Sequence, residues 1–530
     1  MAAALAGLEA GAWLSPQARC QTLLDHDPDD IHASLLLGLA IAGMGQPGRA
    51  APVLDRVARR RPDHAHPCTD FATLCAPPSA AALYRACMRL APDNARLRRD
   101  FASFLLENDG AMEAEQVLLD APDGTPDTAA ARHLMGLALT EQARFAAAIQ
   151  QFRTAILLDP VPSMAWANLG MVLKIERRFD AALEAYDQAI ARSPRDASIR
   201  VNRMVALLHA GRWTEAWHDG DWRLRLPGYH GLPVAGLLPD LETLGDLRGR
   251  TVLVTHEEGF GDTLQFLRYV PLLAARGARV LAQVPMTLTR LARGVAGVAD
   301  VLPEGASPPR YDYHCPVVSL PRAFGTTPAT IPAERYLWAD PIEAARWDAR
   351  LPRGGLRVGL VWAGQARPWL PGFTVLDARR SAGSAVFSPL GAVAGVTFIS
   401  LQMGEAAALP PPGMRLTNPM SDVRDFADTA AIVANLDLVI SVDTSVVHLA
   451  GAMGKPVFML DRYDNCWRWL SGRADSPWYP ALTIFRQEQP GDWSAPMKRL
   501  TAALAGLVAF RGMTATDVHP SPVRECSDAA

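Results

Sequence analysis

The sequence is poor in cysteine, carries almost no excess charge and has no long hydrophobic run. Its seven cysteines are scattered over 530 residues without a C-x-x-C pair, which argues against a metal cluster and a disulfide framework. A formal net charge of −3 offers no basic footprint for nucleic acid or for an anionic membrane. These shortages favour a protein of a reducing cytoplasm that binds no nucleic acid.

The sequence also lacks the signals of membrane insertion and export. No stretch reaches the roughly 18 uncharged apolar residues that span a bilayer. The start, MAAALAGLEAGAWLSPQARC, has no positive region before its apolar residues and contains Glu9, so we expect no signal peptide. The composition, 49% hydrophobic and 20% charged, is that of an ordinary folded protein. We therefore expect a cytoplasmic protein without a transmembrane segment.

A period of 34 residues runs through the first part of the sequence. Prolines recur in steps of 34, with one step of 30, at Pro28, Pro62, Pro92, Pro126, Pro160 and Pro194. Phased alanines accompany them at Ala50, Ala80, Ala114, Ala148, Ala182 and Ala216, and aromatic residues precede the last three at Phe145, Phe179 and Trp213. Alanine lets two helices approach closely, and proline ends the second helix. The pattern predicts an α-solenoid of tetratricopeptide repeats, whose concave surface would hold a protein partner.

After the repeats the sequence changes to short apolar strands that alternate with helices. One series contains TVLVT, a helix over 263–276 and RVLAQV, and a second contains RVGLVWAG, VTFISL, DLVISV and PVFML. Two such series predict two Rossmann-like α/β halves, with a cleft between them at the carboxyl ends of the strands.

These changes of pattern set the expected domain limits. The degenerate early repeats leave the number of intact units before residue 92 open. We expect a repeat solenoid over 1–226, a glycine- and proline-rich linker over 227–250, a first half over 251–350, a second half over 351–512 and a C-terminal tail over 513–530.

Glycine turns at the ends of two strands provide the first candidate site residues. In EEGFGD, Gly259 and Gly261 bracket a turn, and Asp262 enters the following helix. Its carboxylate could take a proton from an attacking hydroxyl, or it could simply cap the helix. In VWAGQ, small residues including Gly364 leave room for a ligand, although a tight turn explains them equally well.

The segment DLVISVDTSVVHLAGAMGKPV provides the second group. A buried strand ends at Asp443, and Thr444 and Ser445 stand where a helix begins. Their hydroxyls and the free backbone N–H groups could bind a phosphate, to which His448 could also donate. The alternatives are a helix N-cap at Asp443 or Thr444 and a satisfied, partly buried histidine at position 448.

Taken together, these motifs resemble a known family. EEGFGDTLQFLRYVPLLAARGARV, RVGLVWAG, DFADTAAIVANLDLVISVDTSVVHLAGAMGKPV and DSPWYPALTIFRQ are similar to bacterial tetratricopeptide-repeat glycosyltransferases with a heptosyltransferase-like region, over roughly residues 248–500. The architecture resembles, more distantly, the O-linked N-acetylglucosamine transferases. The resemblance implies a GT-B fold and a nucleotide-sugar donor bound mainly by the second half.

The resemblance also implies roles for single residues. It makes Asp262 the proposed base and places Thr444, Ser445 and His448 on the donor phosphates. The family's RS after the WAG loop corresponds to DARRS here, so Arg380 would neutralise the departing phosphate.

The chain departs from the family in three places. His256-Glu257 stands where a GE is expected, the loop over 365–377 carries bulky Trp369 and Phe373, and DRYDNCWRWL follows the last strand. In that last segment, Arg468 and Trp469 are candidates to contact the nucleotide base. The donor's identity is therefore left open.

The expected function is that of an inverting glycosyltransferase that needs no metal and no cofactor beyond its nucleotide-sugar co-substrate. The acceptor would be a serine or threonine hydroxyl of a protein held by the repeats, with flagellin as one hypothesis. A catalytically inactive protein-binding scaffold and a transferase to a glycan or lipid-linked acceptor are the alternatives. If the domains act separately, removing the residues before Gly228 should spare donor hydrolysis and abolish protein glycosylation.

Overall fold

The computed structural model describes residues 14–44, 93–120, 128–365 and 373–516, with a few isolated residues between 46 and 88. The chain divides into two compact units. One comprises residues 1–176 and 184–194, and the other comprises residues 177–183 and 195–530.

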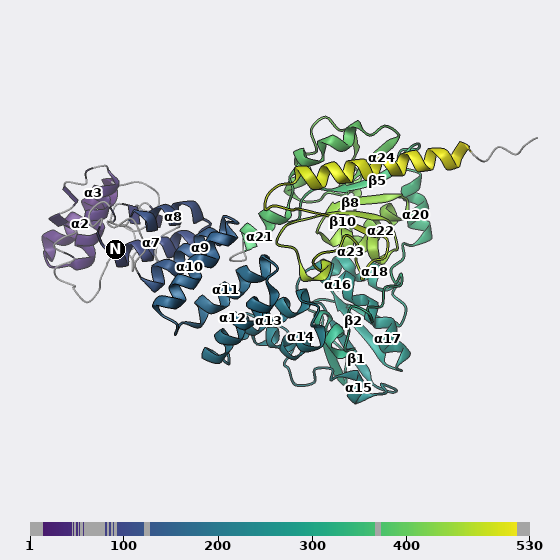
Figure 1. Ribbon diagram of the computed structural model, residues 1–530, viewed down its shortest axis with the longest axis horizontal. Helices are drawn as coiled ribbons and strands as arrows, with labels where there is room; N and C mark the ends of the chain where they lie inside the picture. Colours follow the sequence, from purple (N-terminus) through teal and green to yellow (C-terminus); the bar gives the residue numbers. More distant parts are fainter. Residues whose placement is uncertain are drawn as a thin grey trace, which may run out of the picture. The chain divides into compact units, whose positions relative to one another are not determined.

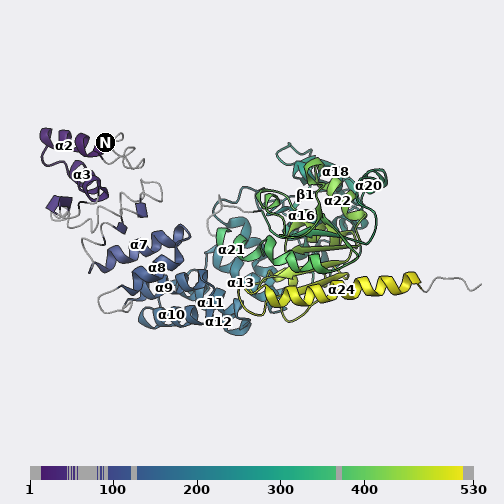
Figure 2. The same ribbon diagram turned by 90° about the horizontal axis from the view of Figure 1, so that it is seen from above.

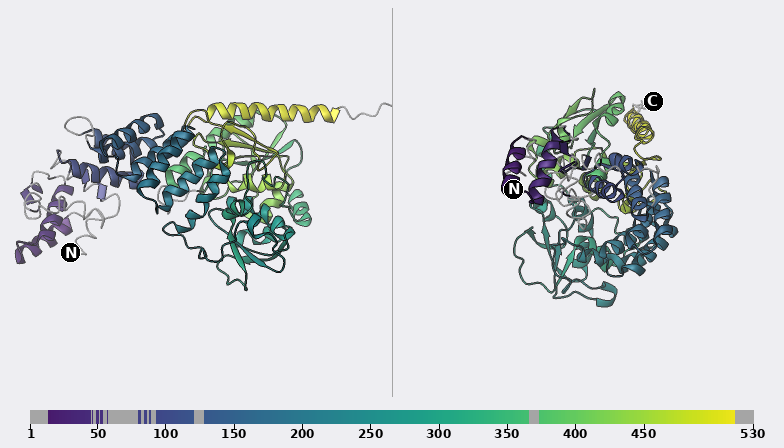
Figure 3. Two further views of the ribbon diagram at one scale, coloured as in Figure 1. Left: turned by 60° about the horizontal axis from the view of Figure 1, so that its bottom comes forward. Right: turned by 90° about the vertical axis from the view of Figure 1, so that its left-hand side faces the viewer.

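The described part of the first unit is helical, and successive helices pack against each other as hairpins (Figure 3). Its helices are α2 (Leu14–His26), α3 (Ile31–Gly43), α7 (Ala95–Glu107), α8 (Ala111–Leu119), α9 (Ala129–Glu141), α10 (Phe145–Leu158), α11 (Ser163–Ile175) and most of α12 (Phe179–Arg192). All six phased alanines, in both units, have no solvent exposure. Close helix packing at these positions is therefore confirmed.

The turn between the two helices of a repeat has a common backbone conformation. A left-handed residue occupies it at Asp109, Ala143, Arg177 and Gly211, with φ of 60°, 57°, 58° and 77°. These positions are again 34 residues apart. Only the last of them is glycine, so three of the four turns carry a side chain where glycine is favoured.

The second unit begins with the last repeat and continues into a four-stranded sheet. The repeat comprises α13 (Ala197–His209) and α14 (Trp213–Gly220), followed by the 3₁₀ turn η1 (Asp221–Arg225) and the short helix α15 (Leu241–Leu244). The strands are β1 (Thr251–Thr255), β2 (Arg279–Val284), β3 (Val298–Pro303) and β4 (Tyr313–Pro316). They are parallel, in the order β3-β2-β1-β4.

The helix expected over 263–276 is instead three shorter elements. They are α16 (Phe260–Phe266), η2 (Leu267–Tyr269) and α17 (Val270–Ala275). Pro271 lies in the first turn of α17, and proline has no N–H for a bond to the preceding turn. The remaining short elements of this half are η3 (Met286–Leu288), α18 (Thr289–Ala292), η4 (Val317–Ser319) and α19 (Leu320–Ala323).

A six-stranded parallel sheet forms the rest of the second unit, in the order β10-β9-β8-β5-β6-β7. Its strands are β5 (Leu356–Val361), β6 (Val396–Ser400), β7 (Leu416–Thr417), β8 (Leu438–Val442), β9 (Val457–Asp461) and β10 (Leu482–Arg486). Its helices and 3₁₀ turns are α20 (Pro341–Asp348), α21 (Phe373–Arg380), η5 (Ser384–Ala392), η6 (Glu405–Ala408), η7 (Met420–Asp422), α22 (Phe426–Ala434), α23 (Ser445–Ala452), η8 (Trp467–Trp469) and α24 (Ser494–Thr516).

The core of this half lies between the sheet and the long helix α24 (Figures 1 and 2). Leu360 and Ile440 of the strands and Leu500 and Leu504 of α24 are among its fully buried members. Strand β8 is buried at all five positions, as its unbroken apolar sequence requires of a central parallel strand. The predicted order of a repeat region followed by two α/β halves is thus confirmed.

Two further expectations concern limits and membranes. The last repeat, α13 and α14, belongs to the second compact unit, while the domain limits at 226, 250, 350 and 512 stay predictions. Within the described ranges, no helix combines the length and the apolar character needed to cross a bilayer.

Candidate active site

Asp262 lies in the first turn of α16, just beyond the carboxyl end of β1. The turn between them passes through Glu258, which has a left-handed φ of 66°. The backbone N–H of Gly259 donates to Asp262 Oδ2 over 3.0 Å, so one carboxylate oxygen caps the start of the helix. The capping role considered for Asp262 is therefore present, and it occupies one of its two oxygens.

The other oxygen of Asp262 is paired with Arg468 from η8 of the six-stranded half. Arg468 Nε also donates to Gln265 Oε1 over 2.9 Å, and its guanidinium lies 4.8 Å from the centre of the Trp467 ring. Burial is the largest single influence and works to lower the pKa of Arg468, but Asp262, Cys466 and Asp443 together outweigh it and the pKa is raised. Arg468 is thus a permanent cation beside the candidate base. Its expected contact with a nucleotide base stays a prediction.

His448 lies in α23 and is only 5% exposed. Its Nδ1 shares a hydrogen bond of 2.9 Å with the Tyr479 hydroxyl, and its ring stacks on Trp469 at 5.2 Å. Burial first, and the charge of Arg468 second, lower the pKa of His448 to about 3. The imidazole is therefore neutral near pH 7, and this environment is that of the satisfied buried histidine considered above. A phosphate contact by His448 stays a prediction.

Gly261 is the point at which α16 and α23 meet. A Cβ atom at this position would lie 2.8 Å from His448 Cδ2 and 3.6 Å from Ser445 Cα. Glycine therefore permits an approach that any side chain would obstruct. The starts of the helices that follow β1 and β8 are brought together here, and with them Asp262 and the predicted phosphate-binding segment.

The predicted phosphate-binding segment, residues 443–448, contains the start of α23, where no side chain among the described residues caps the backbone N–H groups. Thr444 is the N-cap of α23, but its side chain makes no capping hydrogen bond. Its hydroxyl instead lies 3.0 Å from Ser441 Oγ. Asp443, Thr444 and Ser445 are all half-buried.

Gly364 and Arg380 form a second cluster after β5. The Gly364 N–H donates to Ser381 Oγ over 3.2 Å, and a Cβ atom at Gly364 would lie 2.5 Å from Arg380 Nη2. Arg380 Nη2 also donates to Asp377 Oδ1 over 2.8 Å. Most of the altered loop, residues 366–372 with Trp369, lies outside the described residues.

Sequence reasoning gave no supporting role to the residues that hold the Asp262 turn, and it did not name Arg223 at all. Arg223 of η1 makes a two-pronged ion pair with Glu257, with both bonds at 2.7 Å. Nothing in the sequence signalled this pair, because its members are 34 residues apart and belong to different structural elements. Tyr479, the partner of His448, was quoted in a motif but given no role.

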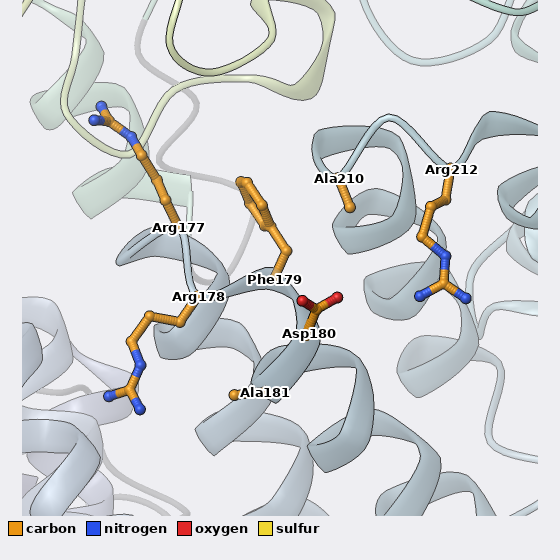
Figure 4. A pocket seen from close by; sticks show the side chains of 7 residues that line it. All are labelled: Arg177, Arg178, Phe179, Asp180, Ala181, Ala210 and Arg212. Carbon is orange, nitrogen blue, oxygen red and sulfur yellow. The ribbon is translucent and has the colours of Figure 1, made fainter.

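A pocket of about 430 Å³ lies at the turns of two successive repeats (Figure 4). Its lining residues are Arg177, Arg178, Phe179, Asp180, Ala181, Ala210 and Arg212. In Figure 4, Asp180 points toward the 210–212 turn, whereas Arg177 and Arg178 extend to the other side. The Arg177 guanidinium lies 5.5 Å from the centre of the Tyr463 ring, in the loop after β9. The pocket therefore adjoins the carboxyl edge of the six-stranded sheet.

Comparison with known families finds the repeats. Residues 129–162 and residues 176–217 both match the tetratricopeptide repeat family. The chain contains tetratricopeptide repeats. The 34-residue period had predicted them at these positions.

Two curated proteins are similar to parts of the chain. Protein FlbA of Caulobacter vibrioides is 29% identical over 465 residues, which cover 82% of this chain and 76% of the relative. A peroxisomal targeting signal receptor of Kluyveromyces lactis is 28% identical over 92 residues, or 17% of this chain and 16% of the receptor. The first likeness thus extends well beyond the repeats, whereas the second is short.

Among solved structures, the glycosyl transferase family 9 protein of Veillonella parvula is 10% identical and has a TM-score of 0.38. It aligns with 50% of this chain and 99% of its own. MamA is 22% identical with a TM-score of 0.26, over 28% of this chain and 87% of its own. At such TM-scores, neither likeness bears on substrate or mechanism.

Proposed function

We propose that the protein is a glycosyltransferase that moves a sugar from a nucleotide-sugar donor to a hydroxyl group of a protein acceptor. The observation that carries the proposal is the approach of α16 and α23 at Gly261. It brings a carboxylate, Asp262, next to a helix start whose N–H groups suit an anion. Both lie at the carboxyl ends of parallel strands, where α/β proteins bind ligands.

In the proposed reaction the acceptor oxygen attacks the anomeric carbon while its proton passes to Asp262. The bond from that carbon to the donor phosphate breaks, and the configuration inverts. The start of α23, with Thr444 and Ser445, offsets the charge that develops on the departing phosphate, and Arg380 adds a guanidinium. A carboxylate accepts about four hydrogen bonds, so the partners already on Asp262 leave room for the acceptor hydroxyl.

We further propose that the repeats recruit the acceptor and that the pocket at the 177–181 and 210–212 turns is part of its docking surface. Arg177, Arg178 and Arg212 line that pocket together with Asp180. Glu215 pairs with Arg212, so the arginines of the 177–178 turn are the ones that favour an acidic acceptor segment. Its contact with Tyr463 would place the bound segment near the strand ends of the donor half.

The test compares wild type with Asp262→Asn, using CMP-, UDP-, GDP- and ADP-sugars. We expect one nucleotide to stabilise both proteins against heat, and the variant to lose about 10²- to 10⁴-fold in transfer rate, as expected for a lost general base. Asp340→Asn is the control, because the Asp340 carboxylate also accepts backbone hydrogen bonds at a helix start, as the N-cap of α20, but lies outside the site. Full transfer by Asp262→Asn would disprove the base assignment.

The inactive scaffold is the alternative that a specific observation favours, namely the ion pair between Asp262 and Arg468. It predicts that nucleotide stabilises the protein and that no sugar is transferred or hydrolysed from any of the four donor classes. Detection of either product in the wild type, and its loss in Asp262→Asn, rejects it.

A further inference from the structure

The two groups that hold Asp262 are both supported by the last helical repeat. One is the backbone N–H of Gly259 and the other is the Arg468 side chain. The contacts behind them lead to η1 and α14, which were expected to serve only in partner binding.

The first support is the ion pair between Arg223 and Glu257. Their side chains are 6% and 9% exposed, and two bonds of 2.7 Å join them. Arg223 also donates to the Gly220 carbonyl over 2.8 Å and to Ser319 Oγ over 2.7 Å. Burial is the largest single influence and works to lower the pKa of Arg223, but the nearby acidic groups, Glu257 foremost, together outweigh it and the pKa is raised. Arg223 is therefore a fixed cation whose donors are satisfied by both the repeat and the first half.

Glu257 lies directly before the strained part of the turn. Glu258 has a left-handed φ of 66°, a strained conformation for a residue with a side chain, which persists only where neighbouring contacts enforce it. On one side of Glu258, the ion pair with Arg223 fixes Glu257. On the other side, the N–H of Gly259 bonds to Asp262. The ion pair thus sets the direction of the N–H that orients the candidate base.

The second support is an aromatic cluster under η8. Trp213 of α14 lies 5.7 Å from both Trp467 and Trp478, measured between ring centres. The Trp213 indole N–H donates to the Leu208 carbonyl over 3.0 Å, which fixes the ring within the repeat. Trp467 directly precedes Arg468, so the position of the guanidinium on Asp262 depends on packing against the repeat.

We infer that Arg223 is a positioning residue for Asp262, acting through Glu257, and that the last tetratricopeptide repeat is a structural part of the candidate active site. This inference rests on the proposed function. It opposes the expectation that donor hydrolysis survives removal of residues before Gly228. That truncation removes Arg223 and Trp213 together and should abolish donor hydrolysis as well as transfer.

The test uses full-length Arg223→Gln and Arg223→Lys, with Arg203→Gln as the matched control. Arg203 is an arginine of α13 that also bonds a buried carboxylate, over 2.7 Å, but its partner Asp219 belongs to α14 of the repeat itself. We expect Arg223→Gln to lower kcat by about 10- to 100-fold, the effect of a misplaced catalytic group. Donor-induced thermal stabilisation should be retained, lysine should restore part of kcat, and the control should stay near wild type.

Two further readouts separate positioning from general damage. The pH dependence of kcat should change in Arg223→Gln, because the surroundings of the base change, and hydrogen exchange of peptides over 256–264 should become faster. If Arg223→Gln does not fold, Ser319→Ala removes one acceptor of Arg223 and should give the same changes to a smaller degree. A folded Arg223→Gln with unchanged kcat, pH profile and exchange would overturn the inference.

Hydrogen exchange also distinguishes a wrong role for Arg223 from a wrong proposed function. Faster exchange over 256–264 with equal activity of wild type and Asp262→Asn would mean that Arg223 holds the turn but that Asp262 is not the base. Loss of transfer in Asp262→Asn with an unaffected Arg223→Gln would leave the proposed function standing and refute the role of the repeat.

Discussion

The contact between α16 and α23 makes a sharp prediction for Gly261→Ala. The added methyl group would lie 2.8 Å from His448 Cδ2 and 3.6 Å from the Ser445 backbone. The imidazole cannot easily yield, because Tyr479 holds its Nδ1 and the Trp469 ring lies against it. Overpacking of this kind costs about 1–3 kcal/mol. The second unit comprises residues 177–183 and 195–530, and for a unit of roughly 340 residues this cost lowers Tm by about 1–4 °C.

The assay is thermal unfolding of the second unit in the full-length protein, with Gly506→Ala as control. Gly506 lies in α24 with no atom near its missing Cβ, so alanine there should leave Tm unchanged or raise it slightly. A double-mutant cycle with His448→Ala should show a coupling energy of about 0.5–3 kcal/mol, because removing the ring relieves the clash. An unchanged Tm in Gly261→Ala would refute the close approach of the two helices.

Three further predictions follow from single residues. Gly211→Ala should destabilise the last repeat by about 1–2 kcal/mol in chemical unfolding, although its Cβ would touch nothing, because φ is 77° there. His448 has a pKa of about 3 when folded, below its ordinary 6.5. It should therefore contribute stability above pH 6.5 that is lost toward pH 3, by up to about 1.4 kcal/mol per pH unit. Burial raises the pKa of Asp461 to about 6, so its contribution to the free energy of unfolding changes in the opposite direction and is lost as the pH rises from about 4 to 6. The difference between wild type and His448→Asn in unfolding at each pH isolates the histidine. Finally, Arg178→Glu should weaken binding of an acidic acceptor, most strongly at low salt, and leave donor hydrolysis unchanged. If wild type and variant bind the acceptor with equal affinity at low salt, the pocket is not part of the docking surface.

The regular elements of the second unit were predictable because each is determined by neighbours in sequence. The stretches TVLVT and RVLAQV coincide with β1 and β2, since continuous branched apolar residues at these lengths suit buried parallel strands. The helix over 263–276 was wrong in its continuity. The interruption follows from Pro271, whose effect on the preceding turn outweighed the apolar pattern.

The candidate site was predictable only up to the loops that form it. Strand-end glycines and hydroxyl residues marked Gly261 and Ser445, and α/β sheets bind ligands at the carboxyl ends of their strands. The two loops belong to different sheets, so their approach at Gly261 depends on how the two halves pack. The pairing of Asp262 with Arg468 joins residues 206 positions apart, and the sequence offers 52 lysines and arginines as partners. That choice is made by tertiary packing, which no local pattern records.

The tryptophans around Trp213 give the protein an optical property of its own. The Trp213 and Trp478 rings lie at 26° to one another with centres 5.7 Å apart, and the Trp467 ring is T-shaped to both. Indoles this close couple electronically and should give a strong near-ultraviolet circular dichroism signal. Because Trp213 belongs to α14 and the other two to the α/β region, separation at this junction would remove the signal while far-ultraviolet helicity persists. The protein therefore carries an intrinsic, label-free reporter of whether its last repeat remains docked.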